Sequence, residues 1–415
     1  MKILVIGNGG REHTIAWKVS QNPKVEKVYC APGNGGTYLE NKCENVAIST
    51  KEEMLQFALD NKIDLTIVGP EAYLCDGIVD LFKAHDLKIF GPSMEAAKLE
   101  GSKSFAKAFM KKYGVKTAEY EKFTDCERAV EYIKANDIYP IVIKADGLAA
   151  GKGVIIAENR EEALNAVENM MVNSSFGSAG SEIIIEEFLE GVEVSILSIT
   201  DGNVIIPFVS SKDHKTIYEG NKGPNTGGMG TIAPNPYCTD KVLKDFESDI
   251  LKPTLKGIQA ENMDYKGIIF FGLMITSKGV YLLEYNVRMG DPETQVVLSL
   301  MDSDLVELIE AALNKKLQRD MVKFSNKSAC CVVGVSKGYP GAYEKGKKIT
   351  GMQQCGEKVF VAGAVEKDGD IVTSGGRVIG VTAVGDSIKD AAEKAYKAIE
   401  KIHFDGIFYR KDISE

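Results

Sequence analysis

The sequence of 415 residues lacks an excess of positive charge: 50 Lys and Arg stand against 59 Asp and Glu, a formal net charge of −9. Without a basic surplus there is no electrostatic footprint for nucleic acid or an anionic membrane surface, so we expect neither as a partner. No apolar stretch approaches the roughly 20 residues of a membrane span. The N-terminal apolar run, residues 3–6, is too short for a signal-peptide core. We therefore expect a cytoplasmic protein.

Cysteine pairing is also missing. The eight cysteines are scattered, without a Cys-x-x-Cys pair and without a histidine at metal-ligand spacing, which argues against a zinc site and a disulfide framework. A chain of this length predicts two or three domains at roughly 150 residues each and can bury a core without such staples. The residue present in excess is glycine, at 41 positions against a usual share of about 7%.

The first hundred residues alternate strand-like apolar runs with helical patterns, which predicts βαβ units and a parallel sheet. The expected strands are 3–6, 25–30, 63–68 and 87–90, and the expected helices are 12–20, 51–61 and 77–84. Three of these strands end in Gly-containing turns, at 7–10, 69–71 and 91–93. Ligands of open α/β sheets bind at the carboxyl ends of the strands, so these turns favour a binding crevice, although glycine and proline also punctuate ordinary turns.

The first glycine cluster, Gly7-Asn8-Gly9-Gly10-Arg11-Glu12-His13, follows a strand and opens a helix, where backbone N–H groups can hold an anion. It departs from the dinucleotide fingerprint, because Glu12 stands where that pattern needs glycine and Ala31-Pro32-Gly33 replaces the acidic residue after the second strand. The cluster therefore predicts a phosphate-bearing substrate in preference to a nicotinamide cofactor. We expect His13 to be a structural residue.

The second cluster, 144–154, is close to a P-loop without being one. Only three residues separate Gly147 from Gly151, and Gly153 stands where Ser or Thr would bind Mg²⁺. We expect a strand ending in Lys144 and a glycine loop that folds over phosphates and excludes water, the alternative being an idle hairpin. In the third block, 185–193, a strand runs into an acidic connection that could contact adenine and ribose, or could simply be solvated.

The fourth block, 283–293, contains Glu284, Asn286 and Arg288 at alternate positions of an expected strand. Alternate side chains share a face, so these three should project together, with Tyr281, Leu283 and Tyr285 on the other face. A carboxylate and an amide oxygen are hard ligands suited to Mg²⁺ that bridges nucleotide phosphates. A polar outward face of an antiparallel sheet would show the same period.

Taken in order, these blocks resemble the ATP-grasp superfamily and, within it, the phosphoribosylamine–glycine ligase family. The resemblance spans essentially the whole chain, and its carriers are residues 7–13, 144–154, 213–215, 223–230 and 286–293. It implies a mixed α/β and α+β fold of three parts: an N-terminal, Rossmann-like parallel-sheet domain (1–102), an ATP-grasp domain (103–325) with a mobile lid at about 120–190, and a small C-terminal α+β domain (326–415).

The resemblance also implies the reaction: glycine and phosphoribosylamine are joined at the expense of ATP through a glycyl phosphate, giving glycinamide ribonucleotide in purine biosynthesis. The implied ATP-binding residues are Lys103, Lys144, Gly151, Gly153, Glu186, Leu189 and Glu193. The implied substrate-binding residues are Gly9, Gly10, Arg11, Thr226, Gly227, Gly228, Gly290 and Asp291. Arg288, Lys215 and Asp213 are the implied catalytic residues, and Glu284 and Asn286 the ligands of Mg²⁺ or Mn²⁺.

The strand expected at 268–275 carries no carboxylate, where many ATP-grasp members supply a further metal ligand. The competing interpretations are another ATP-grasp carboxylate–amine ligase of purine metabolism, a carboxylating relative, and a nucleotide-binding regulatory module without catalysis. A nicotinamide oxidoreductase is disfavoured by Glu12. Nothing in the sequence demands an oligomer, so we expect a monomer without a fused partner enzyme.

Overall fold

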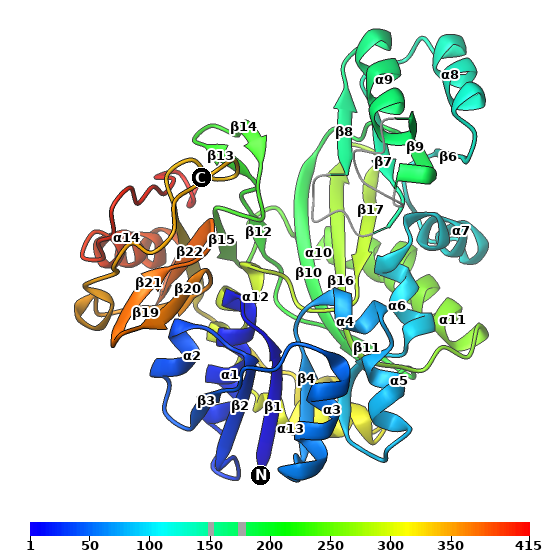
Figure 1. Ribbon diagram of the computed structural model, residues 1–415. Helices are drawn as coiled ribbons and strands as arrows, with labels where there is room; N and C mark the ends of the chain where they lie inside the picture. Colours follow the sequence, from blue (N-terminus) through cyan, green and yellow to red (C-terminus); the bar gives the residue numbers. More distant parts are fainter. Residues whose placement is uncertain (148–152, 173–179) are drawn as a thin grey trace.

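The computed structural model describes residues 1–147, 153–172 and 180–415. Figure 1 shows the N-terminal strands at the bottom, a small sheet with two helices at the upper right, and the C-terminal sheet on the left. No helix within the described ranges is long and apolar enough to cross a membrane. Gly151, one of the residues implied in ATP binding, lies outside the described residues.

The N-terminal part is the expected parallel sheet, with strands in the order β3-β2-β1-β4-β5. Its strands are β1 (Lys2–Gly7), β2 (Lys27–Pro32), β3 (Cys43–Asn45), β4 (Leu65–Val68) and β5 (Ile89–Pro92). Its helices are α1 (Gly10–Ser20), α2 (Gly35–Leu39), α3 (Lys51–Asp60), α4 (Glu71–Cys75), α5 (Ile78–Lys83) and α6 (Met94–Gly101). The four predicted strands and three predicted helices are confirmed, and β3, α2, α4 and α6 were not foreseen.

This sheet continues into the middle of the chain through antiparallel pairing of β5 with β16, at Tyr265↔Pro92 and Lys266↔Gly91. The added strands are β10 (Val192–Thr200), β11 (Ile205–Pro207), β16 (Tyr265–Thr276) and β17 (Gly279–Asn286). The helices of this part are α7 (Lys103–Tyr113), α10 (Asp240–Phe246), α11 (Lys252–Ala260), α12 (Glu293–Leu300) and α13 (Leu305–Leu313). One sheet therefore joins the turns of the N-terminal strands to the Glu284 strand.

A bulge changes the faces of β17. Glu284 pairs with Gly272, but Leu282 pairs with the very next residue of β16, Leu273, so Leu283 is an extra residue in β17. The buried positions therefore switch phase, from Val280 and Leu282 before the bulge to Tyr285 after it. The expectation that Tyr281, Leu283 and Tyr285 share a face is wrong for this reason.

The small upper sheet has the order β6-β9-β7-β8 and is wholly antiparallel. It consists of β6 (Tyr120–Phe123), β7 (Ile141–Ala145), β8 (Val154–Ala157) and β9 (Ile183–Glu187), with α8 (Cys126–Ala135) and α9 (Arg160–Val167). Ile143, Ile183 and Ala163 belong to a separate apolar core within this sheet and its helices. Lys144 and Glu186 thus lie on neighbouring strands of one small unit.

The C-terminal sheet has the order β12-β15-β18-β22-β19. Its strands are β12 (Lys212–Asp213), β15 (Gly230–Ala233), β18 (Ser328–Val335), β19 (Lys358–Val361) and β22 (Arg377–Gly385), with α14 (Ile388–Ile399) packed against β18 and β22. Two hairpins accompany it, β13 (Thr216–Tyr218) with β14 (Lys222–Asn225) and β20 (Ala364–Lys367) with β21 (Asp370–Thr373). The α+β character is confirmed, and β12 and β15 come from a segment more than 90 residues earlier in the chain.

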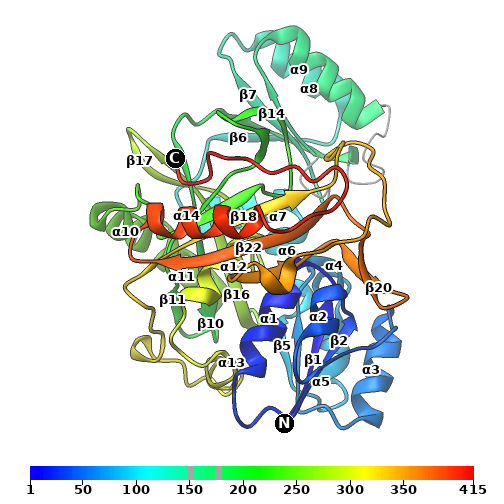
Figure 2. The ribbon, with the colours of Figure 1, turned by 90° about the vertical axis from the view of Figure 1, so that its left-hand side faces the viewer.

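The N-terminal and C-terminal parts meet at His13, as Figure 2 shows for α1 and α2 beneath the C-terminal sheet. His13 Nδ1 accepts a hydrogen bond from Val361 N (2.8 Å), which leaves Nε2 to donate to Glu40 Oε1 (3.0 Å). Lys358 also pairs with Glu40. Burial is the main reason that the pKa of His13 is lowered, so the ring is neutral at pH 7. The expected structural role of His13 is confirmed.

Glu40 gives this interface a pH dependence. Burial would raise the pKa of Glu40, but His13 and Lys358 hold it at about 2, below its ordinary 4.5. A depressed carboxyl pKa stabilises the fold above pH 4.5 and ceases to do so as the pH falls toward 2. We expect Glu40→Gln to lower the free energy of unfolding by ~2 kcal/mol at pH 7, after allowance for solvent screening.

Urea unfolding of both proteins from pH 7 to pH 2 measures this effect, and the difference should shrink below pH 4.5. The matched control is Glu44→Gln, because Glu44 pairs with Lys27 at an exposed position and should change stability by less than about 0.5 kcal/mol. A Glu40→Gln difference that stays constant across the range contradicts the assignment.

Candidate active site

The glycine turn after β1 lies against a segment 280 residues away. A Cβ on Gly10 would come within 2.6 Å of Gln295 Nε2 and 3.4 Å of Asp291 Oδ1, so a larger residue there would require the Gln295 side chain to move. Arg11 N donates to Asp291 Oδ2 (3.4 Å), which in turn is near Gly9. The structure therefore brings together Gly9, Gly10, Arg11 and Asp291, as expected for one substrate subsite.

Glu12 explains why the turn departs from a dinucleotide-binding pattern. Its buried carboxylate accepts from Gly9 N (2.6 Å) and pairs with Arg11 Nε, within the first turn of α1. Glu12 and Asp291 thus accept hydrogen bonds from two of the N–H groups at this helix N-terminus. The Arg11 side chain is the positive group that the turn adds to the site.

Arg288 is the most highly connected residue of the site. Its guanidinium donates to Glu71 Oε2 (3.1 Å), Glu100 Oε1 (2.7 Å), Asn286 Oδ1 (2.9 Å) and the Met289 carbonyl (3.3 Å). Arg11 Nη1 donates to the same Met289 carbonyl (3.1 Å) and lies 3.9 Å from Glu71 Oε2. The two arginines of the predicted site therefore share two partners.

Glu284 lies among four cations and has no direct partner within the described part of the chain. Burial would raise the pKa of its carboxyl, but Lys215, Lys144, Lys103 and Arg288 together hold it below its ordinary value. The carboxylate is therefore ionised at neutral pH and free to accept a ligand. These five side chains come from α7, β7, β17 and the segments after β12 and β17.

Two lysines in or next to the small upper sheet form ion pairs with one buried carboxylate. Glu186 pairs with Lys144 (Oε2 to Nζ, 2.9 Å) and with Lys107 (Oε1 to Nζ, 3.2 Å), and all three side chains are less than a tenth exposed. Burial lowers the pKa of Lys107 to about 8, although Glu186 opposes the change. Lys103 Nζ donates to the Gly147 carbonyl (2.9 Å). Sequence reasoning missed Lys107, because nothing in its spacing pointed to Glu186.

A second group of predicted residues surrounds Lys215. Lys215 Nζ pairs with Glu193 Oε2 (2.8 Å), and Glu193 is the main cause of the raised pKa of Lys215. The N–H and hydroxyl of Thr226 both donate to the Lys215 carbonyl (2.7 Å each), and Gly228 N donates to Thr226 Oγ1 (3.0 Å). The predicted segments 213–215 and 226–228 are thus directly bonded.

Asp213 Oδ1 is buried and has no hydrogen-bond partner in the described ranges. Burial and the nearby Glu293 raise the pKa of Asp213 well above its ordinary value, and burial also raises the pKa of Glu293. Glu293 accepts from Ser195 Oγ (3.2 Å) and lies beside Gly290. Glu293 belonged to the sequence block 286–293, although no role was assigned to it.

The C-terminal part adds Arg377 and Tyr339. Arg377 Nη1 donates to the carbonyls of Gly227 and Asp291 (2.6 Å each), and Gly227 N donates to Tyr339 Oη (3.0 Å). Sequence reasoning missed both residues, because each reaches the site across more than 80 residues. The remaining predicted residues are Gly153, whose carbonyl accepts from Ala145 N (2.9 Å) at the base of the β7–β8 hairpin, and the partly exposed Leu189.

The donor set fits a divalent cation bound together with phosphates. No group of three or more His, Cys, Asp or Glu side chains that could hold a metal occurs in residues 1–147, 153–172 and 180–415. Glu284, however, is ionised and unpartnered there, and Asn286 Oδ1 retains a lone pair beside Arg288. One or two protein oxygens completed by substrate phosphates are the usual environment of Mg²⁺.

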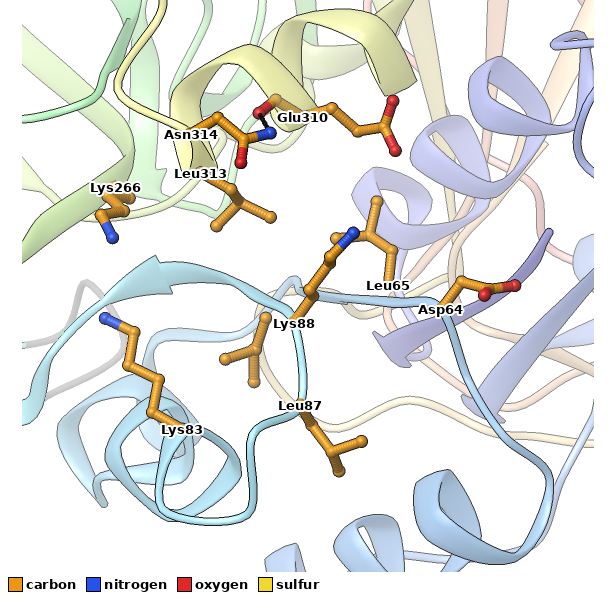
Figure 3. A pocket seen from close by; sticks show the side chains of 10 residues that line it. Asp64, Leu65, Lys83, Leu87, Lys88, Lys266, Glu310, Leu313 and Asn314 are labelled. Carbon is orange, nitrogen blue, oxygen red and sulfur yellow. Dashed lines mark hydrogen bonds between the residues drawn. The ribbon is translucent and has the colours of Figure 1, made fainter.

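A cavity of about 180 Å³ lies elsewhere, at the amino ends of β4 and β5. Lys83, Lys88 and Lys266 line it together with Leu87 and Leu313 of α13 (Figure 3). None of the candidate-site residues lines this cavity, so it is separate from the candidate site.

The continuous sheet, the small antiparallel upper sheet (β6-β9-β7-β8) and the lysines near Glu284 are typical of the ATP-grasp class. Three family models match the chain: phosphoribosylglycinamide synthetase N domain (residues 1–100), ATP-grasp (A) domain (101–294) and C domain (329–415). The chain belongs to the phosphoribosylglycinamide synthetase family, which confirms the resemblance and the three-part fold.

Individual relatives of the chain carry names that agree with this family. A phosphoribosylamine–glycine ligase of Clostridium acetobutylicum is 62% identical over 415 residues, covering 100% of both chains. A crystal structure of phosphoribosylamine–glycine ligase from Thermotoga maritima has a TM-score of 0.88 at 35% identity, covering 99% of this chain and 100% of the other. Biotin carboxylase from Campylobacter jejuni, at 17% identity and a TM-score of 0.75 over 100% of this chain and 94% of its own, shares the fold alone.

Gly228 offers a test of the site geometry. Its φ is +117°, and a Cβ there would meet Pro292 Cδ at 2.4 Å and Asp213 Oδ1 at 2.7 Å. We expect Gly228→Ala to displace the loop against Asp213 and to lower kcat/KM about 100-fold, as misplacements near 1 Å do. The control is Gly220→Ala, where φ is also positive (+66°) but only Lys222 Cε lies near, at 3.9 Å. Equal losses in the two variants would contradict the assignment.

Proposed function

We propose that this chain joins glycine to phosphoribosylamine with ATP as the energy source, and releases glycinamide ribonucleotide, ADP and phosphate in purine biosynthesis. The family membership and the printed names of the full-length relatives support the substrates. The observation that carries the proposal is the buried, unpartnered Glu284, whose carboxyl is held ionised by four nearby cations, Lys103, Lys144, Lys215 and Arg288. Such a set of cations suits the transfer of a phosphoryl group between two anions.

In the first step a carboxylate oxygen of glycine attacks the γ-phosphorus of ATP, and the bond from that phosphorus to the ADP oxygen breaks. The product, glycyl phosphate, has a phosphate leaving group that the carboxylate lacked. Lys103 and Lys144 are placed on the phosphates, and Lys215 and Arg288 on the transferred group. Fixed cations stabilise the charge that develops there without having to reorganise.

Glu284 and Asn286 would hold a divalent cation, Mg²⁺ or Mn²⁺, and such a cation would supply charge neutralisation at the nucleotide phosphates. Both residues sit in β17, whose pairing with β16 fixes them, and Arg288 fixes the Asn286 amide by donating to its oxygen. Glu284 and Asn286 both follow the bulge at Leu283 and stand at alternate positions of β17, so their side chains project from the same side of the sheet.

In the second step the amine nitrogen of phosphoribosylamine attacks the acyl carbon, and the bond from carbon to phosphate oxygen breaks. The nitrogen loses a proton as the amide forms. We assign Asp213 to receive it, because Asp213 Oδ1 is buried and has no hydrogen-bond partner in the described ranges. Gly9, Gly10, Arg11 and Asp291 hold the phosphoribosyl group, and Thr226, Gly227, Gly228 and Gly290 leave room for the reacting atoms.

ATP binds between the lid sheet and the central sheet. Glu186 and Leu189 contact the adenine through their backbones, Glu193 contacts the ribose, and Gly153 lies near the phosphates; Gly151, also assigned to ATP binding, lies outside the described residues. The Glu186 carboxylate has a further role that the geometry supports: it holds Lys144 and Lys107 in place.

We further propose the division into an N-terminal domain (1–102), an ATP-grasp domain (103–325) with a lid at about 120–190, and a C-terminal domain (326–415). The enzyme acts as a cytoplasmic monomer without a nucleic-acid or membrane partner. Only small molecules need to reach the site, and the net charge of −9 offers no basic surface to a polyanion.

Substrate omission tests the function. We expect ADP formation, followed by coupled spectrophotometry, to require glycine and phosphoribosylamine together, because the acyl phosphate is productive only when the amine captures it. Omission of either should lower the rate at least about 100-fold, the scale of losing a reactant held in place. ATP turnover that is indifferent to glycine, or that needs bicarbonate or formate, contradicts the proposal.

Glu284→Gln tests the metal assignment. We expect the variant to retain its fold and thermal midpoint, but to lose kcat about 1,000-fold, because an amide replaces the only carboxylate among the proposed metal ligands. The apparent affinity for Mg²⁺ in the presence of ATP should fall in parallel, measured by titrating the metal at fixed ATP. Glu131→Gln, an exposed exchange on α8, is the control; normal turnover in Glu284→Gln contradicts the assignment.

A further inference from the structure

Glu100 lies in the last turn of α6, and its side chain is only 7% exposed. Its two carboxylate oxygens serve two different donors. Oε1 accepts from Arg288 Nη2 (2.7 Å) and Oε2 accepts from Val287 N (2.6 Å). One buried carboxylate therefore fixes both the backbone and the side chain at the end of β17.

The hydrogen bonds of Arg288 show what Glu100 controls. A guanidinium has five N–H donors, and Glu71, Glu100, Asn286 and Met289 take four of them. One Nη1 donor is left for a substrate anion. Glu71 is 29% exposed and also faces Arg11, so Glu100 is the buried group that sets the direction of this free donor.

Glu100 also begins a segment that reaches the lid. Ser102 Oγ and Ser104 N both donate to the Asp146 carboxylate (3.1 Å each), and Lys103 Nζ donates to the Gly147 carbonyl (2.9 Å). Residues 100–104 therefore contact Arg288 on one side and the end of the β7 hairpin strand on the other. These contacts are all made between protein groups, without a nucleotide.

We propose that Glu100 is a positioning residue: it holds Arg288 and the backbone of Val287 so that the remaining guanidinium donor of Arg288 points to the transferred phosphoryl group. The role rests on the proposed function. In this role Glu100 does not contact the substrate directly but acts on it by holding Arg288. Its pKa, which burial raises to about 7 against the opposing effect of Arg288, agrees with a carboxyl that is isolated from solvent.

The test is a double-mutant cycle in which Glu100→Gln is combined with Arg288→Lys. Glutamine has the same shape but replaces one of the two oxygens with an NH₂ group, which would face either the Arg288 or the Val287 N–H donor and could not accept from it. We expect Glu100→Gln to lower kcat about 10- to 100-fold while the KM for ATP changes less than about threefold, the pattern of an interaction used in the transition state. In the Arg288→Lys background the same exchange should cost less than about threefold, because residues that act through one another are not additive.

A residue with only a structural role would lower kcat by the same factor in both backgrounds, and that additive result overturns the proposal. The control Glu95→Gln lies on the same helix, is 62% exposed in its side chain and pairs only with Lys98; it should leave kcat unchanged. A wild-type enzyme without glycine-dependent turnover overturns the proposed function and this role together. Normal wild-type turnover with an additive cycle overturns the role of Glu100 alone.

Discussion

The site depends on the mutual neutralisation of buried charges. Glu284, Glu186 and Glu100 are carboxylates that would be unfavourable away from water, and Lys103, Lys107, Lys144, Lys215 and Arg288 are cations with the same difficulty. Each sign makes burial of the other possible. Because the partners come from separate segments, the charges can be buried together only when the central sheet, the lid sheet and the α6–α7 connection have assembled. The fold and the cluster of buried charges at the candidate site thus depend on each other.

This constraint explains an uneven distribution of partners. Most cations of the site pair with a carboxylate, whereas Glu284 is approached by four cations and bonded to none in the described parts of the chain. The pairs hold the lysines in place without using every N–H group. Glu284, by contrast, has both carboxylate oxygens available to a ligand.

Much of the fold was predictable because local patterns determine it. The strands predicted at 3–6 and 63–68 and the helix predicted at 51–61 overlap β1, β4 and α3, because apolar period and turn residues mark these elements. The bulge at Leu283 was not predictable, since it depends on how β16 and β17 align. Likewise, the glycine blocks identified Lys144 and Arg288, but Lys107, Glu100 and Arg377 are ordinary helix and strand residues in sequence. Only the assembled fold reveals their partners.

The strands β12 and β15 belong by sequence to the middle of the chain and by hydrogen bonding to the C-terminal sheet. A cut at residue 326 would leave three strands of that sheet on one fragment and two on the other, each with an open edge of unpaired backbone groups. The C-terminal part is therefore not a detachable module. An exchange of this part between relatives would have to carry residues 212–233 with it, and with them Asp213 and Lys215 of the site itself.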